Sequence, residues 1–280
     1  MNPTSPEQTP LAKPHAWRPG AFLLIQLALH GAALLQWMVY PQQWQWAAAV
    51  VLLSQSMLVA TSLWPRSSWL GANLVRLPAA AVQRGEVAIT IDDGPDPQVT
   101  PQVMAILAQH GAHATFFCIG ERAAAHPELC RKLLAAGHRI ENHGAHHPIL
   151  CSFSSPAAWR REILGGQHIL HHITGMTPQF YRPVAGLRNP FLDPVLHACG
   201  LHLASWTRRG FDTRERDANK VLQRLTHQLA AGDILLLHDG NAARTTSGEA
   251  LVVTVLPQLL AAIRGHGLSP VTLAHACKLP

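Results

Sequence analysis

The chain has 280 residues, which is enough for one large domain with an extension or for two ordinary domains. It is 48% hydrophobic and only 14% charged, a balance that is apolar for a soluble protein and indicates that part of the chain lies in lipid. The formal net charge is +6, but the Lys and Arg residues are scattered and form no basic block interleaved with aromatic residues, which argues against nucleic-acid binding.

Two apolar segments stand near the N-terminus, after a Pro-rich tail of residues 1–19 that we expect to be disordered. They are AFLLIQLALHGAALLQWMVY (21–40) and QWAAAVVLLSQSMLVATSLW (45–64), and neither contains a charged residue. Each has the length that a helix needs to cross a bilayer, and aromatic residues cluster at the ends, as at membrane interfaces. We predict a transmembrane helical hairpin over residues 20–65; the alternative is a buried hairpin of a soluble protein.

The charges that flank the hairpin predict its orientation. Lys13 and Arg18 precede the first span, Arg66 and Arg76 follow the second, and the loop between the spans is uncharged. The positive-inside rule then places both termini in the cytoplasm of a bacterial-type inner membrane, together with everything after residue 65. An extracytoplasmic domain is the alternative.

After a linker (66–84), residues 85–275 alternate between apolar runs and helix-like segments, and a short tail (276–280) follows. Seven runs are predicted as buried strands from their length and β-branched content: EVAITI, HATFFCI, HRIEN, PQFYRP, LHLASW, DILLLH and SPVTLA. Helical periodicity is clearest in residues 99–111, 126–138 and 155–175. This alternation predicts a parallel α/β fold, either an open sheet or a barrel.

Polar residues follow several of the predicted strands. Active residues of parallel α/β folds gather at the carboxyl ends of the strands, so these side chains should share one face. They are Asp92, Asp93, Glu141, Asn142, His143, Arg182, His238 and Asp239.

The chain has five cysteines, an odd number, and no CxxC pair. We expect buried apolar thiols rather than a disulfide framework or a zinc knuckle. An odd set of thiols mildly favours a reducing compartment.

The segment ENHGAHHP (141–148) contains two histidines four residues apart, His143 and His147, which one helical turn would place on one face. Two imidazoles and one carboxylate form a common open metal site, and Asp93 can supply the carboxylate. Its neighbour Asp92 would then face the reacting water as general base. A cation would also keep the adjacent carboxylates of TIDDGPDP (90–97) ionised. The alternative is an exposed turn with Asx-type hydrogen bonds.

Five segments occur in the order and at the spacing of the motifs of the polysaccharide deacetylase (NodB-homology, carbohydrate esterase family 4) superfamily. They are TIDDGPDP, NHGAHHP, YRPVAG, SWTRRGFDT and LLLHD, and ATFFCIG (114–120) resembles the second strand of that family. The resemblance covers about residues 85–275. It implies a distorted (β/α)7 barrel and metal-assisted removal of an N-acyl group, usually acetyl, from an amino sugar.

The resemblance also implies roles for single residues. Asp93, His143 and His147 would bind the divalent ion, with zinc as the first expectation and Co²⁺, Ni²⁺ or Mn²⁺ as alternatives. Asp92 would deprotonate the metal-bound water. On the opposite side of the substrate, the family pattern places an acid and its partner: His238 would protonate the leaving amine, and Asp212 would partner that histidine. Arg182 would tether the base, Asp92.

Further residues are expected to contact the substrate. The main-chain N–H of Ala185 would stabilise the oxyanion, Leu236 would line the pocket for the acyl methyl group, and Trp206 would line the substrate groove. Three departures from the family pattern put the substrate preference in doubt: Gly144 replaces a hydroxyl residue, Val184 and Ala185 replace a proline and an aromatic residue, and Arg209 stands where many members are acidic.

We therefore predict a metal-dependent hydrolase that removes an N-acyl group from an amino sugar of a poly- or oligosaccharide. An alternative substrate is a lipid-linked or membrane-borne sugar intermediate. An alternative of another class is a non-catalytic carbohydrate-binding module. Membrane lipid is an expected partner and nucleic acid is not, while the sequence does not indicate an oligomeric state.

Overall fold

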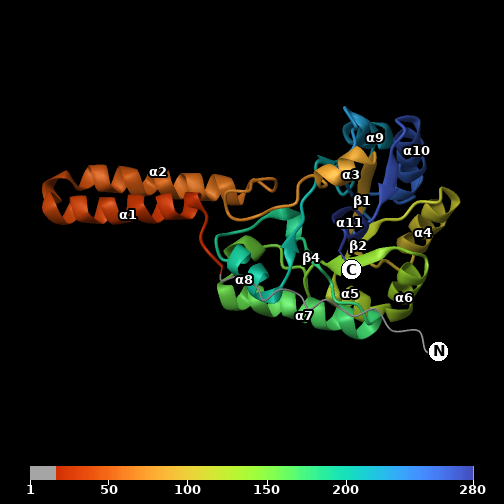
Figure 1. Ribbon diagram of the computed structural model, residues 1–280, viewed down its shortest axis with the longest axis horizontal. Coiled ribbons are helices and arrows are strands. Elements are labelled where there is room, and N and C mark those ends of the chain that lie inside the picture. The colour runs from red at the N-terminus through yellow and green to blue at the C-terminus, as the bar shows by residue number, and fades with distance from the viewer. Residues whose placement is uncertain (1–16, 280) are drawn as a thin grey trace, which may run out of the picture.

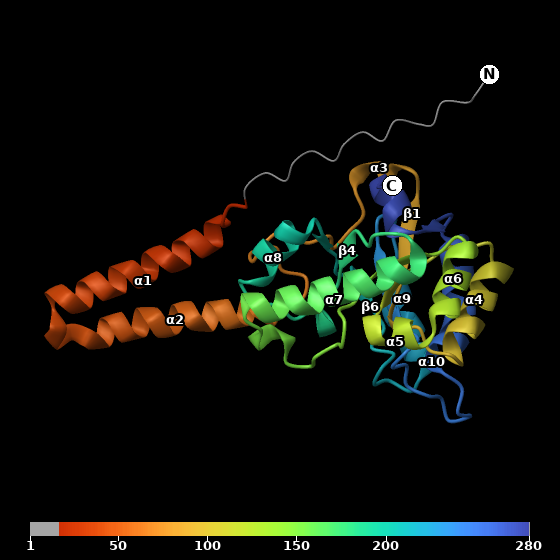
Figure 2. The same cartoon turned by 90° about the horizontal axis from the view of Figure 1, so that it is seen from below.

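The computed structural model describes residues 17–279, so nearly all of the tail predicted over residues 1–19 lies outside the described residues. A helical hairpin projects from an α/β body, as two perpendicular views show (Figures 1 and 2). In both views the base of the hairpin meets the side of the body that carries α8 and β4.

The hairpin consists of α1 (Ala21–Val39) and α2 (Trp44–Ser62), which are joined by a 3-10 turn, η1 (Pro41–Gln43). Both helices are long and apolar enough to cross a membrane. Only 11% of the most apolar 18-residue stretch of each is buried within the protein. Four of their polar side chains face each other: Ser54 Oγ donates to Gln26 Oε1, and Gln55 Nε2 lies 2.9 Å from His30 Nε2. The two helices weakly suggest a membrane anchor.

The body is built on one parallel sheet with the strand order β5-β4-β3-β2-β1-β7-β6, and β8 pairs with the start of β1. Each predicted strand is present, and the predicted parallel α/β fold is confirmed. The prediction of seven strands was one short, because β6 is a two-residue strand of arginines without an apolar signal. The strands are β1 (Glu86–Gly94), β2 (Thr115–Cys118), β3 (Arg139–Asn142), β4 (Phe180–Tyr181), β5 (His202–Leu203), β6 (Arg208–Arg209), β7 (Ile234–His238) and β8 (Ser269–Val271).

The sheet curls until its two outer strands, β5 and β6, are separated by only residues 204–207. The segment predicted as a linker contributes to this closure. Leu74 bridges Ala204 in parallel, and Arg76 bridges Asp233 in an antiparallel manner. A short helix, α3 (Ala79–Gln83), follows and buries Ala81 completely. Residues 74–83 therefore pack as part of the body.

Helices cover the outer surface of the curled sheet (Figure 1). The three predicted helices are confirmed as α4, α6 and α7, and the sequence reasoning did not mark the others. The predicted tail 276–280 starts inside the last helix. The helices are α4 (Val99–Gln109), α5 (Gly120–Ala125), α6 (Pro127–Ala135), α7 (Pro156–Thr174), α8 (Leu192–Cys199), α9 (Ala218–Thr226), α10 (Leu251–Gly265) and α11 (Leu273–Cys277).

Strand alternation separates the main core from the interior of the curl. Val87, Ile89 and Ile91 of β1 pack in the large cluster beneath the helices, whereas Ala88 belongs to the inner cluster. Since successive side chains of a strand point to opposite faces, Thr90 and Asp92 point inward with Ala88. All five cysteines are free, and Cys118, Cys130 and Cys151 are buried, as expected.

Candidate metal and acid–base site

A cavity of about 180 Å³ opens at the carboxyl ends of the strands. It gathers residues from all five motifs, including the strand ends of β1 and β7. Arg182 and Asp212, the remaining two predicted residues, lie fully buried behind its wall. The lining residues are Asp92, Asp93, His143, His147, Val184, Ala185, Trp206, Arg209, Thr213, Leu236, His238 and Asn241.

The two adjacent aspartates reach the same cavity because the strand stops being regular between them. Asp92 is still in register with His238 of β7 and points inward. Asp93 would point to the opposite face in a regular strand, but its φ is 73°. This left-handed conformation costs a residue with a side chain about 1 kcal/mol or more. It turns the second carboxylate toward the histidines.

Asp93, His143 and His147 form a cluster that can hold a metal ion. One ligand atom from each lies within 4.8 Å of the others. Asp93 Oδ1 is 3.1 Å from Nε2 of both histidines and accepts no hydrogen bond from any other group. His143 Nδ1 is 2.6 Å from the Arg182 carbonyl oxygen, which can only accept, so the proton is on Nδ1 and Nε2 is left as a ligand atom. This donor set fits a divalent cation such as zinc.

The loop that carries His147 is held by Glu162 of α7, which the sequence reasoning missed. Its Oε1 accepts from the main-chain N–H groups of His146 (2.7 Å) and His147 (2.9 Å). His147 is itself in the left-handed region, with a φ of 59°. A Cβ on Gly144 would lie 2.6 Å from Glu162 Oε1. The glycine therefore makes room for the carboxylate, which takes over the supporting role expected of a hydroxyl group at position 144.

Asp93 has two further supports that the sequence did not reveal. Asn241 Nδ2 donates to its Oδ2 (2.8 Å), and Arg122 Nη1 donates to its carbonyl oxygen (2.7 Å). Burial disfavours the charged carboxylate, but the contacts with His143 and His147 outweigh it and hold the pKa of Asp93 well below its usual range. The group is therefore anionic at neutral pH, as a metal ligand requires.

Asp92 is aimed by the buried Arg182, as the resemblance implied. Arg182 Nη1 donates to Asp92 Oδ1 (2.6 Å) and to Thr90 Oγ1 (2.9 Å). Its other nitrogens donate to the carbonyl oxygens of Ala204 and Ser205, in the segment that closes the sheet. With these bonds satisfied, the guanidinium cannot rotate freely. Asp92 Oδ2, 4.0 Å from His143 Nε2, is left facing the cavity.

His238 lies across the cavity from the metal cluster and is paired with Asp212. Asp212 Oδ1 is 2.9 Å from His238 Nδ1, and its Oδ2 accepts from the main-chain N–H of His238 (2.7 Å). Burial lowers the pKa of the imidazole, but the Asp212 carboxylate, with Asp92 and Asp93, raises it to about 9. The imidazole is therefore protonated at neutral pH, and its Nε2 is free to act as an acid.

The remaining wall comes from the predicted substrate residues. Leu236 is two residues before His238 on β7 and so points inward. Ala185, in the 3-10 turn η3 (Val184–Gly186), has a φ of 53°, the third strained residue in the site. The Arg209 guanidinium stacks 5.3 Å from the ring centroid of Trp206 and 5.1 Å from that of Phe211.

Three other predicted polar residues support the structure from outside the cavity. Glu141 accepts from the main-chain N–H groups of Gln179 and Phe180, and burial raises its pKa to about 7. Asp239 accepts from Thr100 Oγ1, and burial likewise raises its pKa to about 7. Asn142 donates to the Ile163 carbonyl oxygen. These residues fix β4, α4 and α7 rather than line the site.

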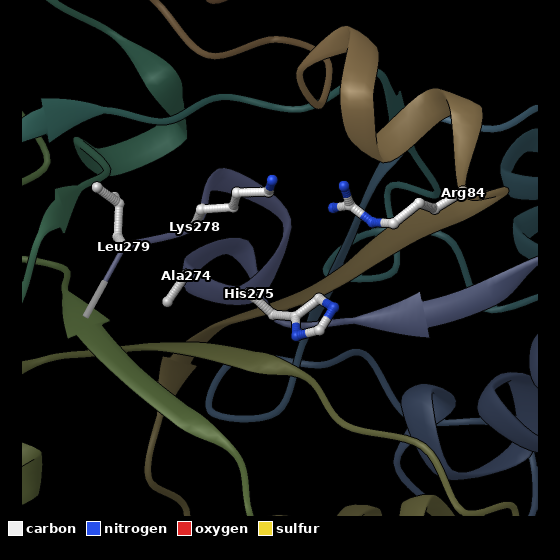
Figure 3. A pocket seen from close by; sticks show the side chains of 5 residues that line it. All are labelled: Arg84, Ala274, His275, Lys278 and Leu279. Carbon is white, nitrogen blue, oxygen red and sulfur yellow. The ribbon is translucent and has the colours of Figure 1, made fainter.

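A larger cavity of about 700 Å³ lies near the start of β1, at the other end of the strands. Arg84 and Lys278 extend into it from opposite sides, with His275 beneath them (Figure 3). Arg84 and His275 both contact Glu86, at 2.6 and 3.3 Å. Since two of its three basic groups are already paired with a carboxylate, we do not assign it a ligand.

Comparison with known proteins supports the resemblance seen in the motifs. A family model described as polysaccharide deacetylase matches residues 79–204. A peptidoglycan-N-acetylglucosamine deacetylase of Bacillus cereus is 35% identical over 62% of this chain and 81% of its own length. The chain belongs to the polysaccharide deacetylase family. A chitooligosaccharide deacetylase of a Bradyrhizobium species is 30% identical over 71% of this chain and 98% of its own length.

Solved structures of the polysaccharide deacetylase family share the curled fold. A peptidoglycan N-acetylglucosamine deacetylase in complex with 4-naphthalen-1-yl-N-oxidanyl-benzamide matches 78% of this chain and 99% of its own, with 26% identity and a TM-score of 0.69. A family 4 carbohydrate esterase from Streptomyces lividans in complex with acetate matches 66% of this chain and 91% of its own, with 29% identity and a TM-score of 0.60. A pseudoenzyme from Bacillus anthracis has the same fold at 18% identity, with a TM-score of 0.65. The match covers 74% of this chain and 69% of the pseudoenzyme.

Proposed function

We propose that this protein is a metal-dependent hydrolase that removes an N-acyl group, acetyl first, from an amino sugar of an oligo- or polysaccharide. The observation that carries the proposal is the placement of two polar pairs around one cavity. The pairs are Asp92 with Arg182 and His238 with Asp212, and Asp92 and His238 line the same cavity as the Asp93–His143–His147 cluster. Family membership supports the same chemistry.

Amide hydrolysis needs a base for the attacking water and an acid for the leaving amine. Asp92 Oδ2 faces the cavity and takes the proton of the water, because Arg182 holds its other oxygen. His238 donates a proton to the amine nitrogen as the C–N bond breaks. The products are acetate and a free amino sugar, and Asp212 stabilises the imidazolium before it gives up its proton.

A divalent ion on Asp93, His143 and His147 would lower the pKa of a water molecule toward neutrality and polarise the amide carbonyl. In this proposal the main-chain N–H of Ala185 donates to the oxyanion, and Leu236 borders the acyl methyl group. The left-handed conformation of Ala185 supports this assignment, since strained residues cluster where groups must be aimed at a reacting atom.

The competing proposal is a non-catalytic carbohydrate-binding module. The chain shares its fold with a pseudoenzyme, so this alternative needs a test. The test is the release of acetate and formate from N-acylated chitooligosaccharides by the full-length protein in detergent, before and after chelation and with zinc restored. We expect acetate release that chelation abolishes and zinc restores. Full metal occupancy without release from any N-acyl sugar, combined with sugar binding, would favour the module.

The hairpin is proposed to anchor the enzyme in a membrane. The predicted cytoplasmic orientation is tested by labelling Ser247→Cys, in an exposed loop, with an impermeant thiol reagent in intact cells. Labelling would contradict it. The positive-inside count rests mainly on Lys13, Arg18 and Arg66, because Arg76 is paired with Asp233 at 3.2 Å.

A further inference from the structure

The base of the hairpin is bonded directly to the wall of the candidate active site. Ser205 Oγ donates to the Pro65 carbonyl oxygen (2.8 Å), and Arg66 Nη1 donates to the Thr207 carbonyl oxygen (3.0 Å). The residue between these two, Trp206, lines the cavity. The cavity is thus fixed close to the end of α2 rather than carried on a free linker.

Gly186 shows how close the end of the hairpin lies to the wall of the cavity. A Cβ on Gly186 would lie 2.6 Å from Pro65 Cβ and 2.7 Å from the Trp206 ring. The guanidinium of Arg209 stacks on the same Trp206 ring. Pro65, Gly186, Trp206 and Arg209 therefore form a row of close neighbours that leads from the end of the hairpin to the cavity.

Exposed apolar side chains surround this end of the molecule. Ile149 is 80% exposed and Phe153 is 84% exposed, in the loop that directly follows the candidate metal ligand His147. We call the set the apolar rim; it comprises Trp64, Trp69, Ile149, Leu150, Phe153 and Phe191, all exposed. Scattered exposed apolar residues are ordinary, but a group gathered at one end of a protein marks an interaction surface.

Hydrogen bonds join the three segments of the apolar rim. Asn189 Nδ2 donates to the Ser154 carbonyl oxygen (2.8 Å), which links the loop of Phe153 to that of Phe191. Arg188 N donates to the Ser62 carbonyl oxygen (3.3 Å), which links the loop of Phe191 to the hairpin. The apolar rim is therefore continuous with two helices that are long enough to cross a membrane.

The charge around the apolar rim suits a lipid surface. Residues 60–71, 143–161 and 184–192 contain no Asp or Glu, and they include Arg66, Arg160 and Arg161. Apolar side chains flanked by basic residues bind the headgroup region of anionic bilayers.

Arg209 gives the cavity an unpaired positive charge on the side nearest the apolar rim. Within residues 17–279 its side chain forms no hydrogen bond or ion pair; it contacts only the rings of Trp206 and Phe211, and its buried Nε has no partner. A guanidinium held beside aromatic rings can present its Nη groups as paired N–H donors, which match a phosphate group.

From these observations we propose that the amino sugar processed here is linked through phosphate to a membrane lipid. The apolar rim rests in the bilayer surface and Arg209 binds the phosphate. This inference rests on the proposed deacylase function and replaces its oligo- or polysaccharide substrate with a lipid-linked sugar. It holds for either orientation of the membrane protein.

The first test locates the apolar rim. An environment-sensitive fluorophore is attached at Phe153→Cys in a chain whose half-buried Cys199 and Cys277 are replaced by serine, and the full-length protein is placed in nanodiscs with spin-labelled lipid. The matched control is Met176→Cys, beyond the other end of α7, about 28 Å away along 19 helical residues. We expect quenching at position 153 and little at 176. Equal quenching, or none at 153, would overturn the proposal.

The second test compares four N-acetylglucosamine substrates with the full-length protein in nanodiscs. They are a long-chain prenyl phosphate-linked sugar, a neutral glycolipid with the same sugar, a soluble sugar phosphate diester and chitotetraose. We expect kcat/KM for the first to exceed each of the others at least tenfold. Arg209→Gln should reduce its advantage over the neutral glycolipid about tenfold, and Arg209→Lys should retain part of that advantage.

The outcomes separate the two proposals. Acetate release from chitotetraose that equals or exceeds release from the lipid-linked sugar would overturn the membrane-borne substrate and leave the deacetylase standing. Equal rates on the two glycolipids would overturn the role of Arg209. No release from any substrate by the metal-loaded protein would mean that the proposed function itself has failed.

Discussion

The two halves of the site are built in different ways. Asp92 and His238 form the last register pair of two adjacent strands, β1 and β7. The metal half lies beyond the strands, and Asp93 and His147 both have positive φ angles. Strand geometry places the acid–base half, which Arg182 and Asp212 then orient, whereas the metal half needs supports from α5, α7 and the loop after β7. The difference predicts that distant substitutions should affect metal affinity more readily than proton transfer.

The largest effect should come from Asp92→Asn. Removing the base should lower kcat by about 10³-fold while zinc still binds, because Asp92 is outside the ligand cluster. Turnover and zinc stoichiometry are measured on the same sample. Asp96→Asn, in the same loop, is the matched control, since Asp96 accepts from main-chain N–H groups of Gln98 and Val99 and should tolerate the change. Loss of zinc from Asp92→Asn would show that the two aspartates' roles are wrongly assigned.

His147→Ala should release the metal, because two ligands remain of three. We expect zinc affinity to fall at least 100-fold, measured by competition with a chelating dye. His146→Ala is the control, since this neighbouring imidazole is exposed and outside the cluster. A His147→Ala protein that binds one zinc ion with unchanged affinity would refute the ligand set.

Glu162→Ala tests the support of the metal half directly. Its carboxylate holds the backbone of the His147 loop, so its removal should weaken zinc binding about 10- to 100-fold, as for other residues that orient metal ligands. The exposed Glu128→Ala on α6 provides the comparison. If zinc affinity is unchanged, the loop holds its strained conformation without Glu162, and the contrast between the two halves weakens.

Asp212→Asn should change the pH profile of the acid–base half. In the proposed reaction His238 is the acid, so kcat/KM should fall as pH rises through the His238 pKa, which lies at about 9. A bound cation nearby would lower that pKa and move the basic limb of the profile to lower pH. Without the Asp212 charge, burial should dominate and shift the basic limb down by about one pH unit or more. A limb that does not move in Asp212→Asn, with the fold intact by circular dichroism, would exclude His238 as the titrating acid.

The acid–base half could be predicted from the sequence because apolar alternation fixes which side of a strand each residue faces. Asp92 and Leu236 follow from that rule alone. The supports could not be predicted in this way: Glu162 is 15 residues beyond His147, on a helix whose polar face looks ordinary. The only sequence signal was Gly144, which we interpreted as a missing hydroxyl group and which instead makes room for Glu162.

β6 and the bridges made by Leu74 and Arg76 escaped prediction for a similar reason. A strand of two arginines has no apolar pattern. It is recognised only from its parallel pairing with Leu235 and Leu236 of β7. The roles of Ala185 and Trp206 and the domain boundaries stay predictions.

The bridges made by Leu74 and Arg76 have a consequence for folding and for truncation. Arg76 pairs with Asp233, 157 residues later, so the curl is secured only after β7 has been synthesised. Such long-range contacts slow folding, because the intervening chain must be ordered first. A soluble fragment that starts at residue 79, where the family model begins, would lack both bridges. A fragment intended to fold without the hairpin should therefore keep residues from Pro65 onward, including the bond between Pro65 and Ser205.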